Sequence, residues 1–220
     1  MTSLIAAVLL FAAAKEPYKE RVFDPTGLDA ATIQSMADRG TFLVVDENDK
    51  GRPELVTAGV VIDATPETVY GVITDYAHFT EFMPQLEECK VVKEREDGTR
   101  DVEFSLKFKV SVMTQRIHYT ARFHTYVPNE KVAFEFIKGD LKDGGGSYLL
   151  VPYENGKKTM LFYSTISDAK ETGYFTRKLI EDQPQMEGAL MVSTASVVSG
   201  AVKKRAEKME AKKAQISGVR

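Results

Sequence analysis

Apolar residues in the middle of the chain recur at every second position, which is the spacing of a half-buried strand. From residue 101 to 110 they alternate strictly with charged or hydroxyl residues. The apolar members are Val102, Phe104, Leu106, Phe108 and Val110. The alternation continues through residues 115–127 and 131–137. This period of two is typical of antiparallel strands that cover a core with one face and leave the other to solvent.

Turn-forming residues define further strands on both sides of this region. The letters "NDKGRP" separate two strand candidates, 41–47 and 54–63, which we expect to pair as a hairpin. Pro128-Asn129 is predicted to form a tight turn. Asn155-Gly156, within 144–166, is a strong hairpin signal between two more strands. The letters "DGGGS" before the first of these two strands indicate a turn or a bulge, or alternatively a mobile loop at the rim of a cavity.

Helical spacing appears in residues 65–84 instead. Thr65 is suited to cap a helix, and Pro66 to stand in its first turn, where a missing N–H costs nothing. One apolar stripe follows at i, i+3, i+4 and i+7. The stripe consists of Val69, Val72, Ile73 and Tyr76. A second short helical piece, rich in aromatic residues, is expected to end at Pro84.

Two more helices are predicted, one at each end of the strand region. Residues 29–40 have the pattern of a short amphipathic helix. Residues 172–213 predict a long helix with a broad apolar side and a kink at Pro184. Because an antiparallel sheet needs a cover on its apolar face, we expect the long helix to supply it. The highly charged residues 206–220 are expected to form a solvated tail.

Composition narrows the choice of sites and partners. The 220 residues suffice for one domain with a sizeable core, and the net charge of −3 argues against nucleic acid as a partner. The single cysteine, Cys89, excludes an intramolecular disulfide and a cysteine-based zinc site. The sequence shows neither metal-ligand spacing nor a nucleophile arrangement. We therefore expect no metal, no cofactor and no catalytic residue.

The N-terminus resembles a targeting segment. Residues 1–14 contain an apolar run that is too short to span a membrane and ends in Ala-x-Ala, which is typical of a signal peptide and its cleavage site. The alternative is a hydrophobic helix that stays attached, because no Lys or Arg precedes the run. Residues 15–28 are expected to be a linker. A cleaved signal predicts a periplasmic or secreted protein; otherwise the protein would be cytoplasmic.

Residues 60–92 carry a resemblance to a known family. Their letters are "VVIDATPETVYGVITDYAHFTEFMPQLEECKVV". This stretch resembles the START-like (SRPBCC) superfamily, which includes the polyketide cyclase and coenzyme Q-binding proteins. The resemblance implies an α+β helix-grip fold, with a curved antiparallel sheet wrapped around the long C-terminal helix and two short helices after the first core strand. The START-like lipid-binding domain is placed at residues 29–205.

The resemblance also implies a hydrophobic cavity between the sheet and the C-terminal helix. A closed core built from the same aromatic side chains is the alternative. Either Phe162 or Tyr163 is expected to point inward, and Phe162 is assigned to the wall. The predicted cavity wall consists of Phe79, Phe82, Met83, Phe104, Leu106, Phe108, Tyr119, Phe123, Phe134, Phe136, Phe162, Met186, Leu190, Met191 and Thr194.

Three functions are compatible with this reading. The first is non-catalytic binding and transport of a sterol, a polyprenyl quinone or a phospholipid, with transient membrane contact. The second is a polyketide cyclase or aromatase that uses the same cavity, with Tyr119 or Arg122 as a polar group. The third is an interaction module whose charged C-terminal tail docks on a partner or an anionic membrane, although its mixture of Glu and Lys favours a solvated helix end.

Overall fold

The computed structural model of the protein describes residues 29–49, 51–110, 113–141, 144–167 and 173–217. The predicted signal peptide and linker lie outside these residues. The helices are α1 (Ala30–Ala37), α2 (Pro66–Thr74), the 3-10 helix η2 (Tyr76–Glu81), α3 (Tyr174–Asp182) and α4 (Gln185–Ser217). The strands are β1 (Phe42–Glu47), β2 (Pro53–Ile62), β3 (Leu86–Glu94), β4 (Arg100–Val110), β5 (Met113–Val127), β6 (Lys131–Gly139), β7 (Gly144–Tyr153) and β8 (Lys158–Ser167).

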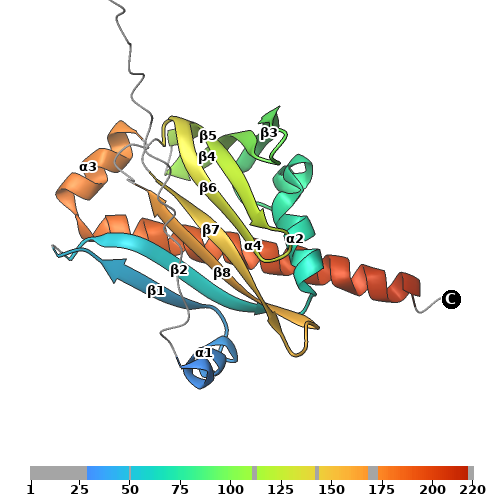
Figure 1. The fold of residues 1–220 in the computed structure, drawn as a ribbon. Coiled ribbons are helices and arrows are strands. Elements are labelled where there is room, and N and C mark those ends of the chain that lie inside the picture. Colours follow the sequence, from blue (N-terminus) through green and yellow to red (C-terminus); the bar gives the residue numbers. More distant parts are fainter. Residues whose placement is uncertain (1–28, 50, 111–112, 142–143, 168–172, 218–220) are drawn as a thin grey trace, which may run out of the picture.

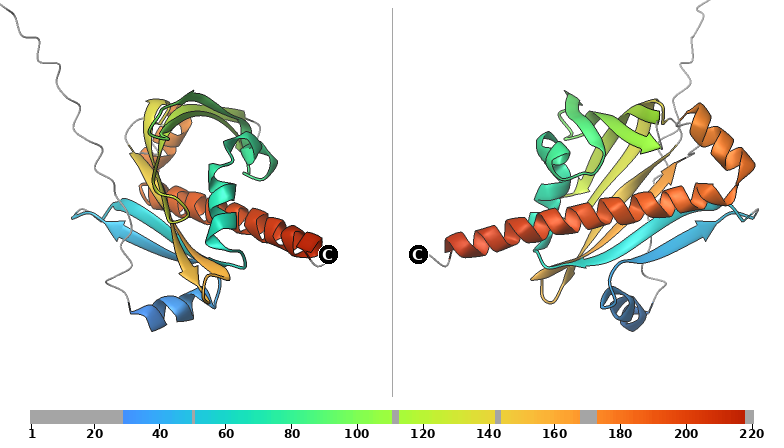
Figure 2. Two further views of the ribbon diagram at one scale, coloured as in Figure 1. Left: turned by 45° about the vertical axis from the view of Figure 1, so that its right-hand side comes forward. Right: turned by 180° about the vertical axis from the view of Figure 1, so that it is seen from behind.

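All of these strands join one antiparallel sheet in the order β1-β2-β8-β7-β6-β5-β4-β3. The predicted hairpins are present, and Asn129 and Asn155 adopt the positive φ angles that tight turns require. The sheet curves into an arch, and α4 spans its open side (Figures 1 and 2). This confirms the predicted fold, a curved antiparallel sheet around a long C-terminal helix.

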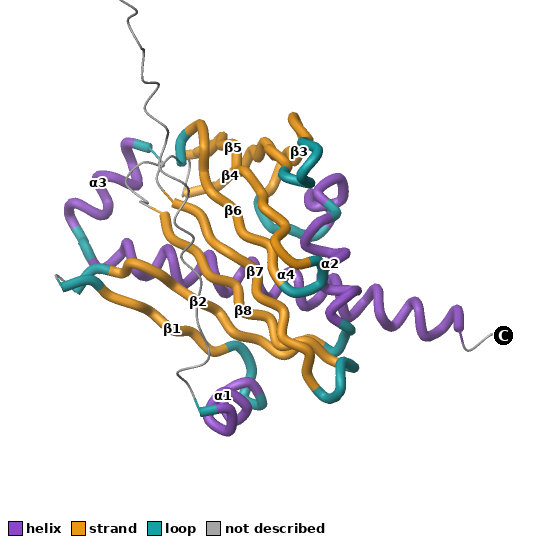
Figure 3. The backbone as a smooth tube through the Cα atoms, viewed as in Figure 1, coloured by secondary structure: helices purple, strands orange, loops and turns teal. Residues whose placement is uncertain are grey.

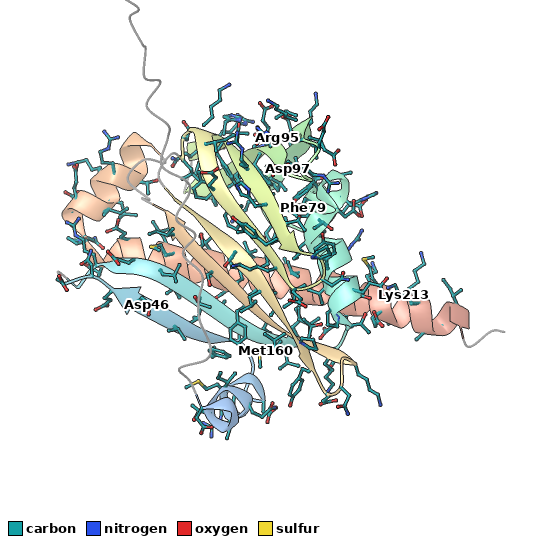
Figure 4. All side chains as sticks on the ribbon, viewed as in Figure 1. Asp46, Phe79, Arg95, Asp97, Met160 and Lys213 are labelled. Atoms are coloured by element: carbon teal, nitrogen blue, oxygen red, sulfur yellow. The ribbon has the colours of Figure 1, made fainter. Side chains whose placement is uncertain are left out.

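Strand alternation gives the sheet two buried layers. The main core lies on the concave face, where Val102, Ala121 and Val132 are almost completely inaccessible to solvent. A smaller apolar cluster lies on the convex face and joins Met160 and Phe162 of β8 to side chains of α1 and β1. Met160 is labelled in Figure 4, on the side of the sheet toward α1.

The two short helices after β2 follow the sequence prediction. The side-chain oxygen of Thr65 accepts the backbone N–H of Thr68, and Pro66 occupies the first position of α2. The predicted stripe is buried, from Val69 through Tyr76. The helix η2 then brings Phe79 into the main core and ends before Pro84.

The C-terminal region differs from the prediction in two ways. Pro184 does not merely kink the helix: Gln183 leaves the helical conformation, so that α3 and α4 are separate. The helix α4 continues past residue 205, as the predicted helix 172–213 does, but it runs beside the sheet and past α2 there (Figure 3), where we expected a solvated tail. Ala206 is fully buried, and Lys213 donates to the Thr68 hydroxyl. No helix among the described residues is both long and apolar enough to cross a membrane.

The glycine run before residue 147 is a strand, not a loop. Gly144 begins β7, and Gly145 and Gly146 are buried in the sheet. A Cβ atom on Gly146 would collide with the carbonyl oxygen of Ser164 and with the ring of Phe134. Glycine is therefore needed here, because the backbone carbonyl of Ser164 and the ring of Phe134 leave no room for a side chain.

Candidate functional site

An apolar cavity of about 470 Å³ lies between the concave face of the sheet and α4. Its wall is built from η2, the strands β3 to β8, α3 and the first half of α4. The volume falls within the range of small-molecule binding sites. The open side of the arch in Figure 2 is the side on which α4 and α2 lie.

Most of the predicted wall residues are brought together at this cavity. They come from four separate regions of the chain, and strand alternation explains why the aromatic ones converge on the concave face. The predicted residues that line it are Phe79, Met83, Phe104, Leu106, Phe108, Tyr119, Phe123, Phe134, Phe136, Leu190, Met191 and Thr194.

Three predicted wall residues do not line the cavity. Phe162 points to the convex face, because its neighbour Tyr163 takes the inward position of β8. Phe82 packs in a T-shaped arrangement with Phe79, with ring centroids 5.5 Å apart, and the Arg205 guanidinium lies over its ring. Met186 lies at the start of α4, only partly buried, and does not reach the wall.

The structure adds wall residues that the sequence did not single out. Strand alternation could have identified Tyr148, since it lies on the inward face of β7 beside Leu150. The others depend on the path of the chain in three dimensions. Thr176 and Leu179 of α3, and Leu141 after β6, close one end of the cavity. No local pattern marks these three as neighbours of the aromatic residues.

Aromatic rings form much of the wall and pack against each other in tilted and stacked arrangements. Ring centroids are 5.0 Å apart for Phe104 and Tyr119, and 5.4 Å apart for Phe123 and Phe134. The rings of Tyr148 and Tyr163 are 4.9 Å apart. Such pairs stabilise the wall beyond simple burial of area. The cavity is therefore bounded by a stiff aromatic surface along the sheet.

The polar groups of the wall are neutral. Hydroxyl and amide side chains line the cavity among the apolar ones, and none of its described lining residues is Asp, Glu, Lys, Arg or His. Burial raises the pKa of Tyr163 to about 12, although a hydrogen bond with Thr165 acts in the opposite direction. Burial also raises the pKa values of Tyr119 and Tyr148 well above the usual value for tyrosine. All three phenols stay protonated near pH 7 and can donate hydrogen bonds.

The cavity reaches the surface at an opening that we call the mouth. Its exposed lining residues are Pro84 and Gln85, before β3, and Ser193, Thr194 and Val197, on α4. The side chain of Val197 is notably exposed for an aliphatic residue. Met83, a flexible side chain that adapts to different shapes, lies next to Pro84 in the wall. None of these lining residues is charged, so an apolar molecule can enter through the mouth without passing a charged side chain of the wall.

Charged groups collect on the convex side of the sheet instead. Asp101 is buried there between the guanidinium groups of Arg95 and Arg122. Arg122, which we had considered as a polar group for the cavity, therefore lies on the face away from it. In the part of the chain that the structure describes, no group of three or more His, Cys, Asp or Glu side chains is arranged to hold a metal ion.

Comparison with protein families agrees with this geometry. The family model described as polyketide cyclase / dehydrase and lipid transport matches residues 62–179, which is more than half of the chain. The chain belongs to this family. A search of curated proteins finds no match. The matched segment begins at the end of β2 and ends in α3, so it contains most of the cavity wall except α4.

Several solved structures share the fold of this chain. A START superfamily protein from Mycobacterium smegmatis aligns with a TM-score of 0.58 at 16% identity, over 71% of this chain and 99% of its own. A STAR-related lipid transfer protein from Xanthomonas axonopodis aligns with a TM-score of 0.57 at 17% identity, over 76% and 93%. The Zhui aromatase/cyclase from Streptomyces sp. R1128 aligns with a TM-score of 0.55 at 18% identity, over 70% and 93%. These likenesses confirm the predicted START-like fold.

Proposed function

We propose that the protein binds a hydrophobic small molecule in the cavity and carries it without changing it chemically. The candidates are a sterol, a polyprenyl quinone and a phospholipid. The observation that carries the proposal is a cavity of about 470 Å³ whose described wall is apolar and free of charged side chains. Burial of apolar ligand surface would contribute roughly 25 cal/mol per Å², less the cost of ordering both partners.

A cyclase or aromatase that uses the same cavity is the alternative, and the wall supports it less well. General acid–base catalysis works best with a group whose pKa lies near the working pH. The described wall contains no carboxylate, imidazole or amine, and burial moves the pKa of Tyr163 to about 12. A carrier needs none of these groups, because binding and release involve no bond change.

Uptake and release require the mouth to open toward a lipid source. Pro84 and Val197 present apolar surface at the mouth, and Met83 beside them can change rotamer to widen it. We propose that these residues contact a membrane transiently when the ligand is exchanged. If residues 1–14 are a cleaved signal peptide, this exchange takes place in the periplasm or outside the cell.

Native mass spectrometry of the protein purified from its own host tests the proposal. The expected result is a stoichiometric adduct that organic extraction releases as an apolar molecule of unchanged structure. An empty protein that also fails to bind sterols, quinones and phospholipids would contradict it. Release of a chemically altered form of an added polyketide would favour the cyclase instead.

A further inference from the structure

Three tyrosine side chains line the cavity, and their placement narrows the class of ligand that it would bind. Tyr119 comes from β5, Tyr148 from β7 and Tyr163 from β8. The rings of Tyr148 and Tyr163 are 4.9 Å apart, and Tyr119 lines the same cavity. We call these three side chains of the cavity wall the tyrosine patch.

Two hydroxyls of the tyrosine patch are without a partner. Tyr163 hydrogen-bonds with the Thr165 side chain. Among the described residues, neither Tyr119 nor Tyr148 has a hydrogen-bond partner for its hydroxyl, although Tyr148 is only 5% exposed. The rings have ample apolar contacts, so phenylalanine would pack equally well. Neither hydroxyl is among the fully enclosed side-chain atoms that lack a partner, so both face the cavity space, where a hydrogen-bond acceptor can reach them.

The cavity contents are the remaining source of an acceptor. The tyrosine patch offers O–H donors, and no side chain of the described wall carries a charge that could neutralise a carboxylate or a phosphate. Burying an unpaired charge is far more costly than burying a neutral oxygen that accepts a hydrogen bond. The wall therefore fits an uncharged ligand end that bears an oxygen atom.

We propose that the tyrosine patch recognises a hydroxyl or carbonyl oxygen on the buried end of an uncharged ligand, which Tyr148 and Tyr119 hold by donated hydrogen bonds. This inference rests on the proposed function and makes it more specific. It favours a sterol or a quinone over a phospholipid bound with its headgroup inside. A charged end, where a ligand has one, lies at the mouth.

Matched ligand pairs that differ by the oxygen test the proposal. The pairs are cholestanol and cholestane, menadione and 2-methylnaphthalene, and hexadecanol and hexadecane. For the pairs that bind, the oxygenated member is expected to bind about 5- to 10-fold more tightly, which corresponds to one or two neutral hydrogen bonds. The double variant Tyr119→Phe/Tyr148→Phe is expected to bring this ratio close to one without weakening the hydrocarbon.

A control variant and a charged ligand make the result specific. Tyr153→Phe removes a hydroxyl at the β7–β8 hairpin, outside the cavity, and is expected to leave every affinity unchanged. Palmitate is the carboxylate counterpart of hexadecanol, and its affinity is expected to be insensitive to Tyr148→Phe because its charge stays at the mouth. A loss for palmitate equal to that for hexadecanol overturns the uncharged part of the proposal.

Different outcomes distinguish a failure of the tyrosine patch from a failure of the carrier function. If the hydrocarbons bind as tightly as their oxygenated partners, the tyrosine patch has no role in recognition, and the carrier function stands. The same conclusion follows if the double variant weakens both members of a pair equally. If no compound of the panel binds to the wild-type protein, the carrier function fails and this inference fails with it.

Discussion

Asp101 shows how strongly a single residue depends on its neighbours across the sheet. Its carboxylate accepts two hydrogen bonds from Arg95, at 2.9 and 2.7 Å, and two from Arg122, at 2.8 and 3.3 Å. The Arg95 guanidinium, followed by that of Arg122, holds the pKa of this carboxyl well below its usual range. Arg95 is labelled in Figure 4, at the β3–β4 end of the sheet.

Replacing Asp101 with Asn is expected to lower the free energy of unfolding by roughly 2 kcal/mol at pH 7, because charge-assisted hydrogen bonds are lost. Since the folded pKa is lowered, the wild-type advantage is complete above the unfolded value of about 3.9 and disappears as the pH falls through the folded value. Urea unfolding of both proteins from pH 7 to pH 2.5 measures this difference.

The matched control is Glu94→Gln. Glu94 pairs with Arg100 at 2.7 Å, but its side chain is 57% exposed, so the pair contributes little. We expect a change in the free energy of unfolding of less than about 0.5 kcal/mol at pH 7. A pH-independent deficit for Asp101→Asn would show that shape, and not charge, explains its effect.

Among the elements, α4 has a different role in each of its halves. Its first half supplies Leu190, Met191 and Thr194 to the cavity wall. Its second half holds the end of β2 and the start of α2: Glu207 accepts the backbone N–H of Asp63, and Glu210 accepts the Thr68 hydroxyl. The charged residues of this half are thus partly engaged in tertiary contacts.

Truncation after residue 205 is expected to lower the free energy of unfolding by roughly 3 kcal/mol, since about three tertiary hydrogen bonds are lost together with the burial of Ala206. Truncation after residue 213 removes only residues beyond these contacts, and it serves as the control. Thermal and urea unfolding of both shortened proteins measure the effect. Equal stability of the two would mean that residues 206–213 behave as a solvated tail.

At the scale of the whole molecule, the cavity couples ligand binding to stability. A ligand that binds only the folded state at 100 times its Kd adds about 2.7 kcal/mol. For a chain of this size, we expect a rise in Tm of about 5–10 °C. Differential scanning fluorimetry with the compounds extracted from the native protein measures the rise.

Ala121→Leu distinguishes binding in the cavity from binding elsewhere. Ala121 lies in the wall, opposite Val102 and Phe136 in the sheet, and a larger side chain there occupies ligand space. We expect the variant to fold and to lose most of the rise in Tm. The control is Ala77→Leu, on the exposed side of η2, which is expected to retain the full rise in Tm. A full rise in Ala121→Leu would place the ligand outside the cavity.

The sequence by itself determined most elements of this protein and the faces of the strands that alternate clearly. Some features depend only on residues close together in the chain, so a short stretch of sequence is enough to predict them. They are the alternation from 101 to 137, the turns at Asn129 and Asn155, and the cap at Thr65. The same alternation assigned Phe104, Tyr119 and Phe134 to the concave face. Together with the resemblance in residues 60–92, these features predicted the fold and the general position of the cavity.

The tertiary structure determined the features that depend on contacts between segments far apart in the sequence. The register of β8 turned Phe162 outward and Tyr163 inward, a one-residue difference that a short, wholly apolar run does not specify. Contacts with α2 and with the end of β2 engage α4 beyond residue 205, although the charges of that segment, taken alone, predict a solvated tail. The tyrosine patch likewise exists only because curvature brings three strands around one space, and no local pattern contains that information.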